Sequence, residues 1–337
     1  GINNYDQGQS SADGVLFLLA LDKPTSARWK EGVNYFKLAA PASEAGPANA
    51  LAAPALAIGA DGSALLAYAG DLQGQLWRFD FGGKPPWSVR ALFTARDAQN
   101  RRQPITHAPK AVFAPGGGYL VLFGTGKFIE HADLQAANFA PQSFYAIHDN
   151  GQGQVRGRSE LALRTLSGSG PYAITGAEFS FGGSIAKLGW YFDFPQAQAD
   201  GERLAGSPIL ASGTVFVNTL LAGADACAAP TARSYVLDAL SGFAFKADGV
   251  AASGAATGEP AQGGEAPVPL LFDSLTTVGP RGATGGAAAV RSIAIVHWRG
   301  EGKPPDVQRV TVTLPARRIS WREVANWQEL HDAAIRK

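Results

Sequence analysis

The sequence predicts an all-β protein, and three observations support this fold class. Segments of five to eight residues rich in Val, Leu, Phe, Tyr and Trp recur along the chain, bounded by Gly, Pro, Asn and Asp, which is typical of strands and turns. The 337 residues include 41 Gly and 21 Pro, which supply many turn positions. A weak internal repeat then favours a propeller over a sandwich or a barrel.

The strand predictions follow the chain in order. We expect strands at Val15–Leu21, Ala64–Ala69, Gln75–Asp80, Tyr119–Phe123, Ser143–His148, Gly189–Phe194, Thr214–Leu220, Ser234–Leu237, Ser292–Trp298 and Gln308–Leu314. A short strand is also expected near Val268–Phe272. Helical pattern is confined to Ala132–Ala137 and the last ten or so residues.

Four of these segments share one shape, in which a Gly or Ser is followed by an apolar strand and then by Asp. They are Gly14–Asp22, Gly74–Asp80, Ser143–Asp149 and Ser234–Asp238, at intervals of roughly 60 to 90 residues. We interpret each as a strand that buries both faces between neighbouring blades and then turns at the Asp. Any β protein contains some strands of this kind, so the repeat favours the propeller without requiring it.

The balance of charge excludes some classes of partner. Lys and Arg number 29 and Asp and Glu 28, for a net charge of +1, so no long-range attraction for nucleic acid or an anionic membrane is expected. No uninterrupted apolar run approaches the roughly 18 residues of a membrane-spanning helix. The single Cys227 is interpreted as a free or buried thiol, because one Cys forms no internal disulfide.

The chain is expected to be one propeller domain over residues 1–337, or the C-terminal part of one. Residues 247–266 and 279–289 consist mainly of Ala and Gly, and we predict that both are surface loops. The chain contains no Met and begins at Gly1, and we interpret it as a mature fragment with further sequence upstream.

Signatures of catalysis are weak, and we predict no catalytic residue. The five His residues are scattered without metal-ligand spacing, and no G-x-S-x-G motif is present. Gly124–Lys127 lacks the upstream Gly of a phosphate-binding loop and is interpreted as a β-turn after Tyr119–Phe123.

The segment Ala57–Leu65 is the part of the chain most similar to a metal-binding loop. Calcium loops alternate oxygen-bearing side chains and place Gly at a sharp turn, and here only Asp61 and Gly62 fit. Since Ala57, Gly59 and Leu65 carry no side-chain oxygen, Asp61 is at most a weak, degraded calcium site. Taken alone, Asp61-Gly62 predicts a type I′ hairpin turn.

Eight segments follow one another in the chain with distinctive sequences. The first is LLAYAGDLQGQLWRFDF at Leu65–Phe81. The others are QPITHAPKAV (Gln103–Val112), GGGYLVLFGTGKFIE (Gly116–Glu130), QSFYAIHDNG (Gln142–Gly151), GWYFDFP (Gly189–Pro195), GERLAGSPIL (Gly201–Leu210), SYVLDALSG (Ser234–Gly242) and RRISWREV (Arg317–Val324). In this collinear order they resemble the C-terminal β-propeller of the PilY/PilC family of type IV pilus biogenesis and tip-associated adhesin proteins.

The resemblance implies a modified seven-bladed propeller, of which this chain would hold the later blades. It also implies an extracellular location at the pilus tip or outer membrane, and roles in pilus assembly, control of retraction and adhesion. Minor pilins, the tip complex and host surface receptors would be the partners. Family members carry an acidic calcium loop where this chain has Ala57, Gly59, Asp61 and Leu65, so we expect no cofactor and doubt calcium binding.

Two hypotheses follow from different classes of protein. The first is a non-enzymatic pilus protein that acts by protein–protein binding through surface loops, with contact residues that the sequence does not name. The alternative is a quinoprotein-type propeller dehydrogenase, because the strand-plus-Asp repeat is similar to the repeats of those enzymes. Against it, no repeated Trp-docking pattern is present in the sequence.

Overall fold

The structure is a computed structural model, and it describes residues 13–42, 48–59, 61–168, 172–204, 206–211, 213–223 and 230–244, together with the backbone of further short segments up to residue 315. Within these residues the regular secondary structure is β-strand, joined by turns and loops, apart from three short 3-10 helices: η1 (His131–Leu134), η2 (Ala136–Asn138) and η3 (Arg158–Glu160). The all-β prediction is confirmed. Among the described helices, none has the length and apolar character to cross a membrane.

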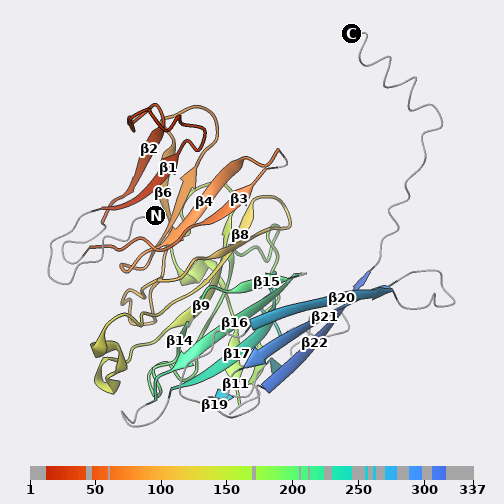
Figure 1. Cartoon of the computed structure of the whole chain (residues 1–337). Helices are drawn as coiled ribbons and strands as arrows, with labels where there is room; N and C mark the ends of the chain where they lie inside the picture. The colour runs from red at the N-terminus through yellow and green to blue at the C-terminus, as the bar shows by residue number, and fades with distance from the viewer. Residues whose placement is uncertain are drawn as a thin grey trace, which may run out of the picture.

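The described strands form six sheets, and two of them are built on antiparallel meanders of four strands, one of which gains a fifth strand (Figure 1). The first meander consists of β3 (Ala55–Ile58), β4 (Ala64–Gly70), β5 (Gln75–Asp80) and β6 (Ser88–Thr94). The second consists of β7 (Lys110–Phe113), β8 (Tyr119–Gly124), β9 (Ser143–Asp149) and β13 (Gly189–Asp193), and β10 (Ala162–Leu163) adds parallel to its β13 edge.

The other sheets precede, flank or follow these meanders. A hairpin of β1 (Gly14–Leu19) and β2 (Tyr35–Ala40) comes first. The next sheet contains β14 (Arg203–Leu204), β15 (Ile209–Ala211), β16 (Thr214–Leu221), β17 (Thr231–Asp238) and β19 (Ala261–Gln262). A small sheet joins β11 (Thr165–Ser167), β12 (Tyr172–Thr175) and β18 (Ala255–Ala256), and a last one joins β20 (Leu270–Val278), β21 (Ala288–His297) and β22 (Asp306–Pro315).

Each of the ten predicted strands coincides with an observed one, and the predicted strand near Val268–Phe272 overlaps β20. The helix expected over Ala132–Ala137 is wrong: η1 and η2 are separate single turns, because Gln135 between them is extended (φ −84°, ψ 123°). The tract 247–266 contains the short strands β18 and β19. The structure does not describe the rest of the tract 247–266, residues 279–287 or Cys227. The helix predicted for the C-terminal residues also lies outside the described residues.

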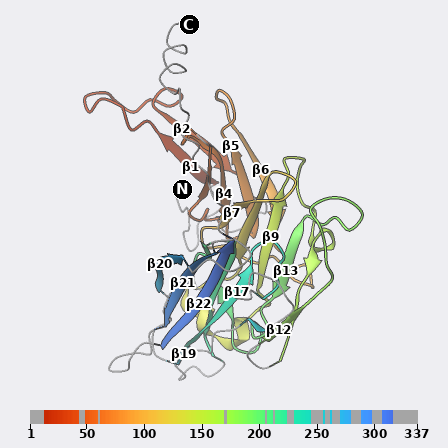
Figure 2. The same cartoon turned by 90° about the vertical axis from the view of Figure 1, so that its right-hand side faces the viewer.

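The sheets stack in chain order, and each middle sheet is buried on both faces. In β8, Leu120 and Leu122 pack against the β14–β19 sheet, whereas Val121 and Phe123 pack against the β3–β6 sheet. Figures 1 and 2 both show the succession from the hairpin β1–β2 to β17. All seven residues of β9 are buried. The interpretation that the repeat strands bury both faces is confirmed for β9, and most residues of β5 and β17 are also buried. It is wrong for β1, which leaves Leu19 53% exposed because this hairpin is the first sheet of the series.

Asp residues end three of the four repeat strands, as predicted. Asp80, Asp149 and Asp238 accept backbone N–H groups two or three residues later, from Gly82 (2.9 Å), Gly151 (3.1 Å) and Ser241 (2.7 Å). Such a bond satisfies a turn donor and starts the connection to the next strand. The fourth member, Asp22, lies in an exposed turn beyond β1.

Asp149 also holds the β3–β6 and β7–β13 sheets together. Its carboxylate accepts the Tyr68 hydroxyl (2.7 Å), Arg78 Nε (2.6 Å) and Arg90 Nη2 (3.2 Å), all from the neighbouring sheet. The Asp149 side chain is only 2% exposed. A buried carboxylate is tolerated where its oxygens meet donors of this kind, so the pairing stabilises one relative placement of the two sheets.

We predict that Asp149→Ala lowers the free energy of unfolding by about 3 kcal/mol or more, because it leaves the Arg78 guanidinium without its inter-sheet partner. Chemical denaturation followed by tryptophan fluorescence measures the change. Asp22→Ala, at the matching repeat position in an exposed turn, should lie within about 0.5 kcal/mol of the parent. Equal stability of the two variants would contradict the assigned role of Asp149.

The Ile105 side chain lies so close to Gly70 that a larger residue at this position should be destabilising. A Cβ there would lie 2.1 Å from Ile105 Cγ2 and 2.4 Å from Ile105 Cβ, and Ile105 is fully buried. Gly70→Ala should therefore destabilise the protein by about 1–3 kcal/mol through overpacking. Gly182→Ala is the matched control, since its Cβ would meet no atom within 4 Å. A thermal midpoint for Gly70→Ala equal to that of Gly182→Ala would contradict the packing argument.

Candidate functional site

The predicted metal-binding segment forms the hairpin loop between β3 and β4. The Gly59 N–H donates to the Ser63 carbonyl (2.8 Å), the Gly62 N–H donates to the Gly59 carbonyl (3.0 Å), and Gly62 has φ +81°. The hairpin turn is confirmed, but the type I′ assignment is wrong. The loop closes at Gly59 and Ser63 and has three residues with Gly62 in the left-handed region, whereas a type I′ turn has two central residues with positive φ.

The Asp61 carboxylate is exposed and already bonded within the loop. Its Oδ1 accepts the Ser63 hydroxyl (2.6 Å) and the Ser63 N–H (3.0 Å), and these bonds lower the pKa of Asp61. Ala57, at an aligned ligand position, is 4% exposed and packs in the core. The part of the chain that the structure describes holds no group of three or more His, Cys, Asp and Glu residues suited to a metal. This donor set does not fit calcium, which takes six to eight oxygens.

The other polar residues singled out from the sequence are engaged in local contacts. Lys127, in the predicted turn after β8, pairs with Glu130 (2.8 Å) and Asp133 (3.1 Å). His148 Nε2 lies 2.9 Å from the Gly117 carbonyl, and burial lowers the pKa of His107. Each of these side chains makes its contacts in a different part of the described structure. They therefore do not form a pair of nucleophile and general base.

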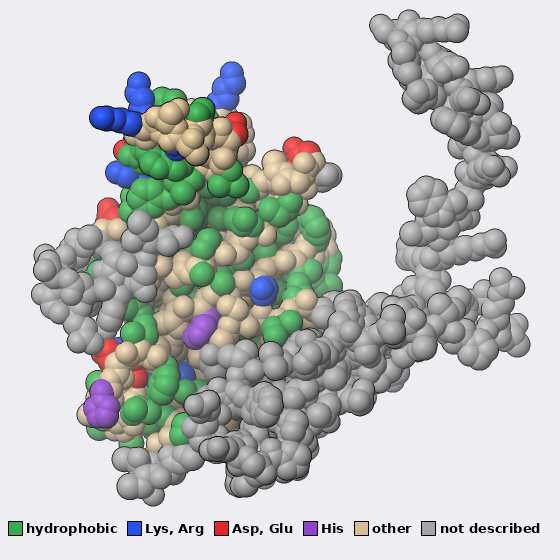
Figure 3. Space-filling model, viewed as in Figure 1, with side chains coloured by type: hydrophobic (Ala, Val, Ile, Leu, Met, Phe, Trp, Pro, Cys, Tyr) green, Lys and Arg blue, Asp and Glu red, His purple; other side chains and the backbone are tan. Residues whose placement is uncertain are grey.

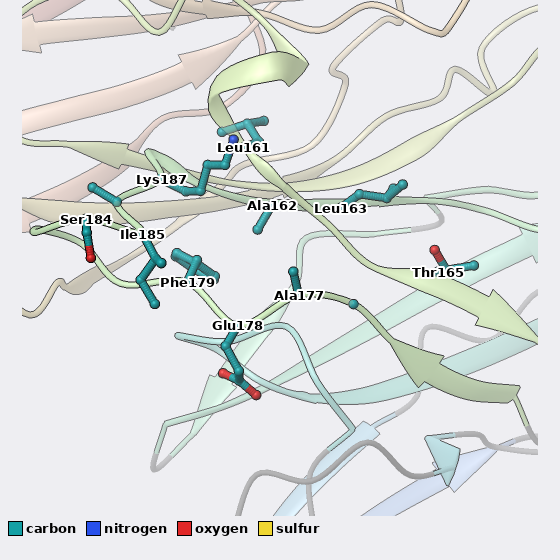
Figure 4. A pocket seen from close by; sticks show the side chains of 12 residues that line it. Leu161, Ala162, Leu163, Thr165, Ala177, Glu178, Phe179, Ser184, Ile185 and Lys187 are labelled. Carbon is teal, nitrogen blue, oxygen red and sulfur yellow. The ribbon is translucent and has the colours of Figure 1, made fainter.

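A surface cleft lies beside β10. It has a volume of about 690 Å³ and lies between β10 and the two segments 176–179 and 184–187 (Figure 4). Leu163 and Ile185 line it and are 48% and 55% exposed. Glu178 and Lys187 add polar groups to its lining, and the Lys187 ammonium donates to the Ser159 carbonyl (3.0 Å). We call this site the β10 cleft.

Arg164 fixes one wall of the β10 cleft from behind. Its side chain is 1% exposed, its Nε donates to the Ser241 carbonyl (2.7 Å), and its Nη1 donates to the Ala177 carbonyl (2.8 Å). The guanidinium lies 4.0 Å from the Phe243 ring centroid. Burial lowers the pKa of Arg164 to about 10, so the group stays charged at neutral pH. The wall is thereby tied to the turn that follows β17.

Sequence reasoning missed the β10 cleft, because its three segments are separated along the chain. A signal was present in Arg164, a cation within the otherwise apolar stretch 161–166. Other exposed apolar side chains include Leu56 on β3 (52%) and Phe113 on β7 (72%). Figure 3 shows hydrophobic side chains scattered over one face of the molecule, with Lys and Arg gathered at the end that carries β1 and β2.

Comparison with known proteins gives consistent matches. Residues 37–167 match the family described as the PilY1 beta-propeller domain. The chain is 31% identical to the type IV pilus biogenesis factor PilY1 of Pseudomonas aeruginosa over 287 residues, which cover 70% of this chain and 24% of that protein. It is 30% identical to a PilY1 homolog of Xylella fastidiosa over 250 residues, covering 66% of this chain and 16% of that protein.

A solved structure also matches. The crystal structure of the P. aeruginosa PilY1 C-terminal domain superposes with a TM-score of 0.57 at 25% identity, covering 81% of this chain and 63% of that one. The chain thus spans a quarter or less of the length of these curated relatives. The resemblance read from the eight collinear segments is confirmed by these matches in family, sequence and structure. The chain belongs to the PilY1 family, in which it corresponds to the C-terminal β-propeller region.

Proposed function

We propose that the chain acts in type IV pilus biogenesis as a non-enzymatic binding module at the cell surface or pilus tip. The observation that carries this proposal is the agreement of family, relatives and solved structure on PilY1, whose members are named type IV pilus biogenesis factors. Minor pilins and the tip complex are the proposed partners. Assembly of the pilus, control of its retraction and adhesion to host surfaces are the proposed roles.

The architecture supports a role in binding. The side chains of the middle strands are buried between sheets. A binding partner would therefore contact the edges of the sheets and the connections between strands. The β10 cleft combines exposed apolar side chains with polar groups in its lining, as protein-binding sites do. We propose that a pilus protein contacts Leu163 and Ile185 there. Since the matches are to pilus factors, we prefer this function to a quinoprotein-type dehydrogenase.

We predict that Leu163→Glu weakens capture of minor pilins at least tenfold, because a charge would then be desolvated in an apolar contact. A pull-down or surface plasmon resonance with purified minor pilins measures the effect. Leu56→Glu is the matched control, since Leu56 is equally exposed on β3 outside the cleft. Binding of Leu163→Glu at parental strength would remove the cleft from the proposed interface, and failure of the parent to bind any minor pilin would overturn the proposed function.

For calcium we predict no dissociation constant tighter than about 1 mM at the Asp61 loop, because one exposed carboxylate supplies too few oxygens. Isothermal titration calorimetry of the parent and of Asp61→Ala should give matching traces. Micromolar affinity that disappears in Asp61→Ala would contradict this prediction.

A further inference from the structure

A second cleft, of about 400 Å³, lies where the β3–β6 sheet meets the connection between β9 and β13. Its lining includes Thr94, Arg96, Asp97, Asn100, Arg156 and Arg158. The two sides are held together by main-chain and side-chain bonds: the Val155 N–H donates to the Leu92 carbonyl (2.8 Å), and the Tyr145 hydroxyl donates to the Arg96 carbonyl (3.0 Å). The cleft is therefore part of the rigid packing. We call it the arginine cleft.

The two segments that form the arginine cleft concentrate positive charge. Residues 90–102 contain four Arg and one Asp, and residues 155–160 contain two Arg and one Glu. These segments carry +3 and +1, whereas the whole chain carries +1. The lining itself has Arg96, Arg156 and Arg158 against the single acid Asp97, and an excess of one sign of charge in a cleft attracts ligands of the opposite sign.

The acids near the arginine cleft have other partners. The Asp97 carboxylate accepts the N–H groups of Gln99 (2.9 Å) and Arg101 (2.8 Å) and the Arg101 Nε (2.7 Å). Asp193 pairs with Arg158 (2.9 Å). Neither carboxylate pairs with Arg96 or Arg156 within the described residues.

The three arginines of the cleft therefore differ in how many of their hydrogen-bond donors are already in use. Arg158 is fixed by the Tyr145 hydroxyl (2.6 Å from Nη2), by the Ser143 hydroxyl (2.7 Å) and by stacking over the Tyr191 ring (4.6 Å). The side chain of Arg96 makes one bond, to the Asn100 carbonyl (2.8 Å), and that of Arg156 makes none with the residues described. Arg158 is held in place and paired with Asp193, whereas Arg96 and Arg156 supply free donors.

We propose that the arginine cleft binds carboxylate groups on an acidic segment of a protein partner. Guanidinium groups bond carboxylates in a bidentate manner, and Arg96 and Arg156 line the same cleft, so a ligand with more than one carboxylate can engage both. No aromatic ring is in its lining, so it lacks the stacking surface typical of single-stranded nucleic acid sites. The proposal goes beyond the proposed function and does not depend on the partner being a pilin.

The test uses the intact chain and a fluorescently labelled ten-residue oligoglutamate in an anisotropy titration at low and physiological salt. We expect binding that weakens with salt and falls at least tenfold in Arg96→Gln/Arg156→Gln. Arg28→Gln, an exposed arginine on the β1–β2 hairpin, should bind like the parent. Circular dichroism verifies folding, and the single variant Arg156→Gln, at an exposed position, serves if the double variant unfolds.

Competition experiments show which kind of anion the arginine cleft prefers. Displacement by an acidic peptide but not by inorganic phosphate at equal total charge supports the proposal. Equal displacement by phosphate, tighter binding of a single-stranded oligonucleotide, or unchanged affinity in the cleft variants would overturn it. Because no pilus protein enters this assay, its failure leaves the pull-down with minor pilins as a separate test of the proposed function.

Discussion

The burial of both faces of the middle sheets is the constraint on which the rest of this structure depends. Residues 120–123 of β8 and residues 144–147 of β9 alternate between two cores, one on each side of the same sheet. Such a strand has no face left for water, so it reads as a continuous apolar run rather than an alternating one. The burial also removes these strands from any role in recognition.

Apolar contact alone is non-directional, so polar groups between the sheets select one relative placement. Asp149 joins the two meanders through Tyr68 and Arg78, and Trp190 Nε1 donates to the carbonyl of Ala239 in the turn that follows β17 of the next sheet (3.1 Å). Within that sheet the fully buried Glu202 accepts the Tyr235 hydroxyl (2.6 Å) and pairs with Arg233 (2.9 Å). Each group has its partners only in this arrangement, which is why charges are tolerated in the core.

The same constraint explains how much the sequence could predict. Strands such as β8 and β9 are recognisable because burial on both faces demands unbroken apolar runs, and the strand-plus-Asp repeat marks where they end. Edge strands such as β3 and β7 were missed because one side meets solvent and their residues are small or mixed. The β10 cleft was not predictable, because it forms within the connection 161–187, where no strand or helix pattern fixes how the segments fold back on one another. At Asp61 the turn was predicted, but its length depends on the closing pair Gly59–Ser63.

Both clefts lie on one element, the connection between β9 and β13 at residues 150–188. In the β3–β6 sheet the third and fourth strands are joined by residues 81–87, whereas the β7–β13 sheet inserts β10, β11, β12 and η3 at the same point. One part of this connection contributes Arg156 and Arg158 to the arginine cleft, and later parts contribute Leu163 and Ile185 to the β10 cleft. Both faces of this sheet are buried, so they offer no surface to a partner. A longer connection between two strands adds exposed surface without changing the core. The connection is therefore where this fold has room for recognition.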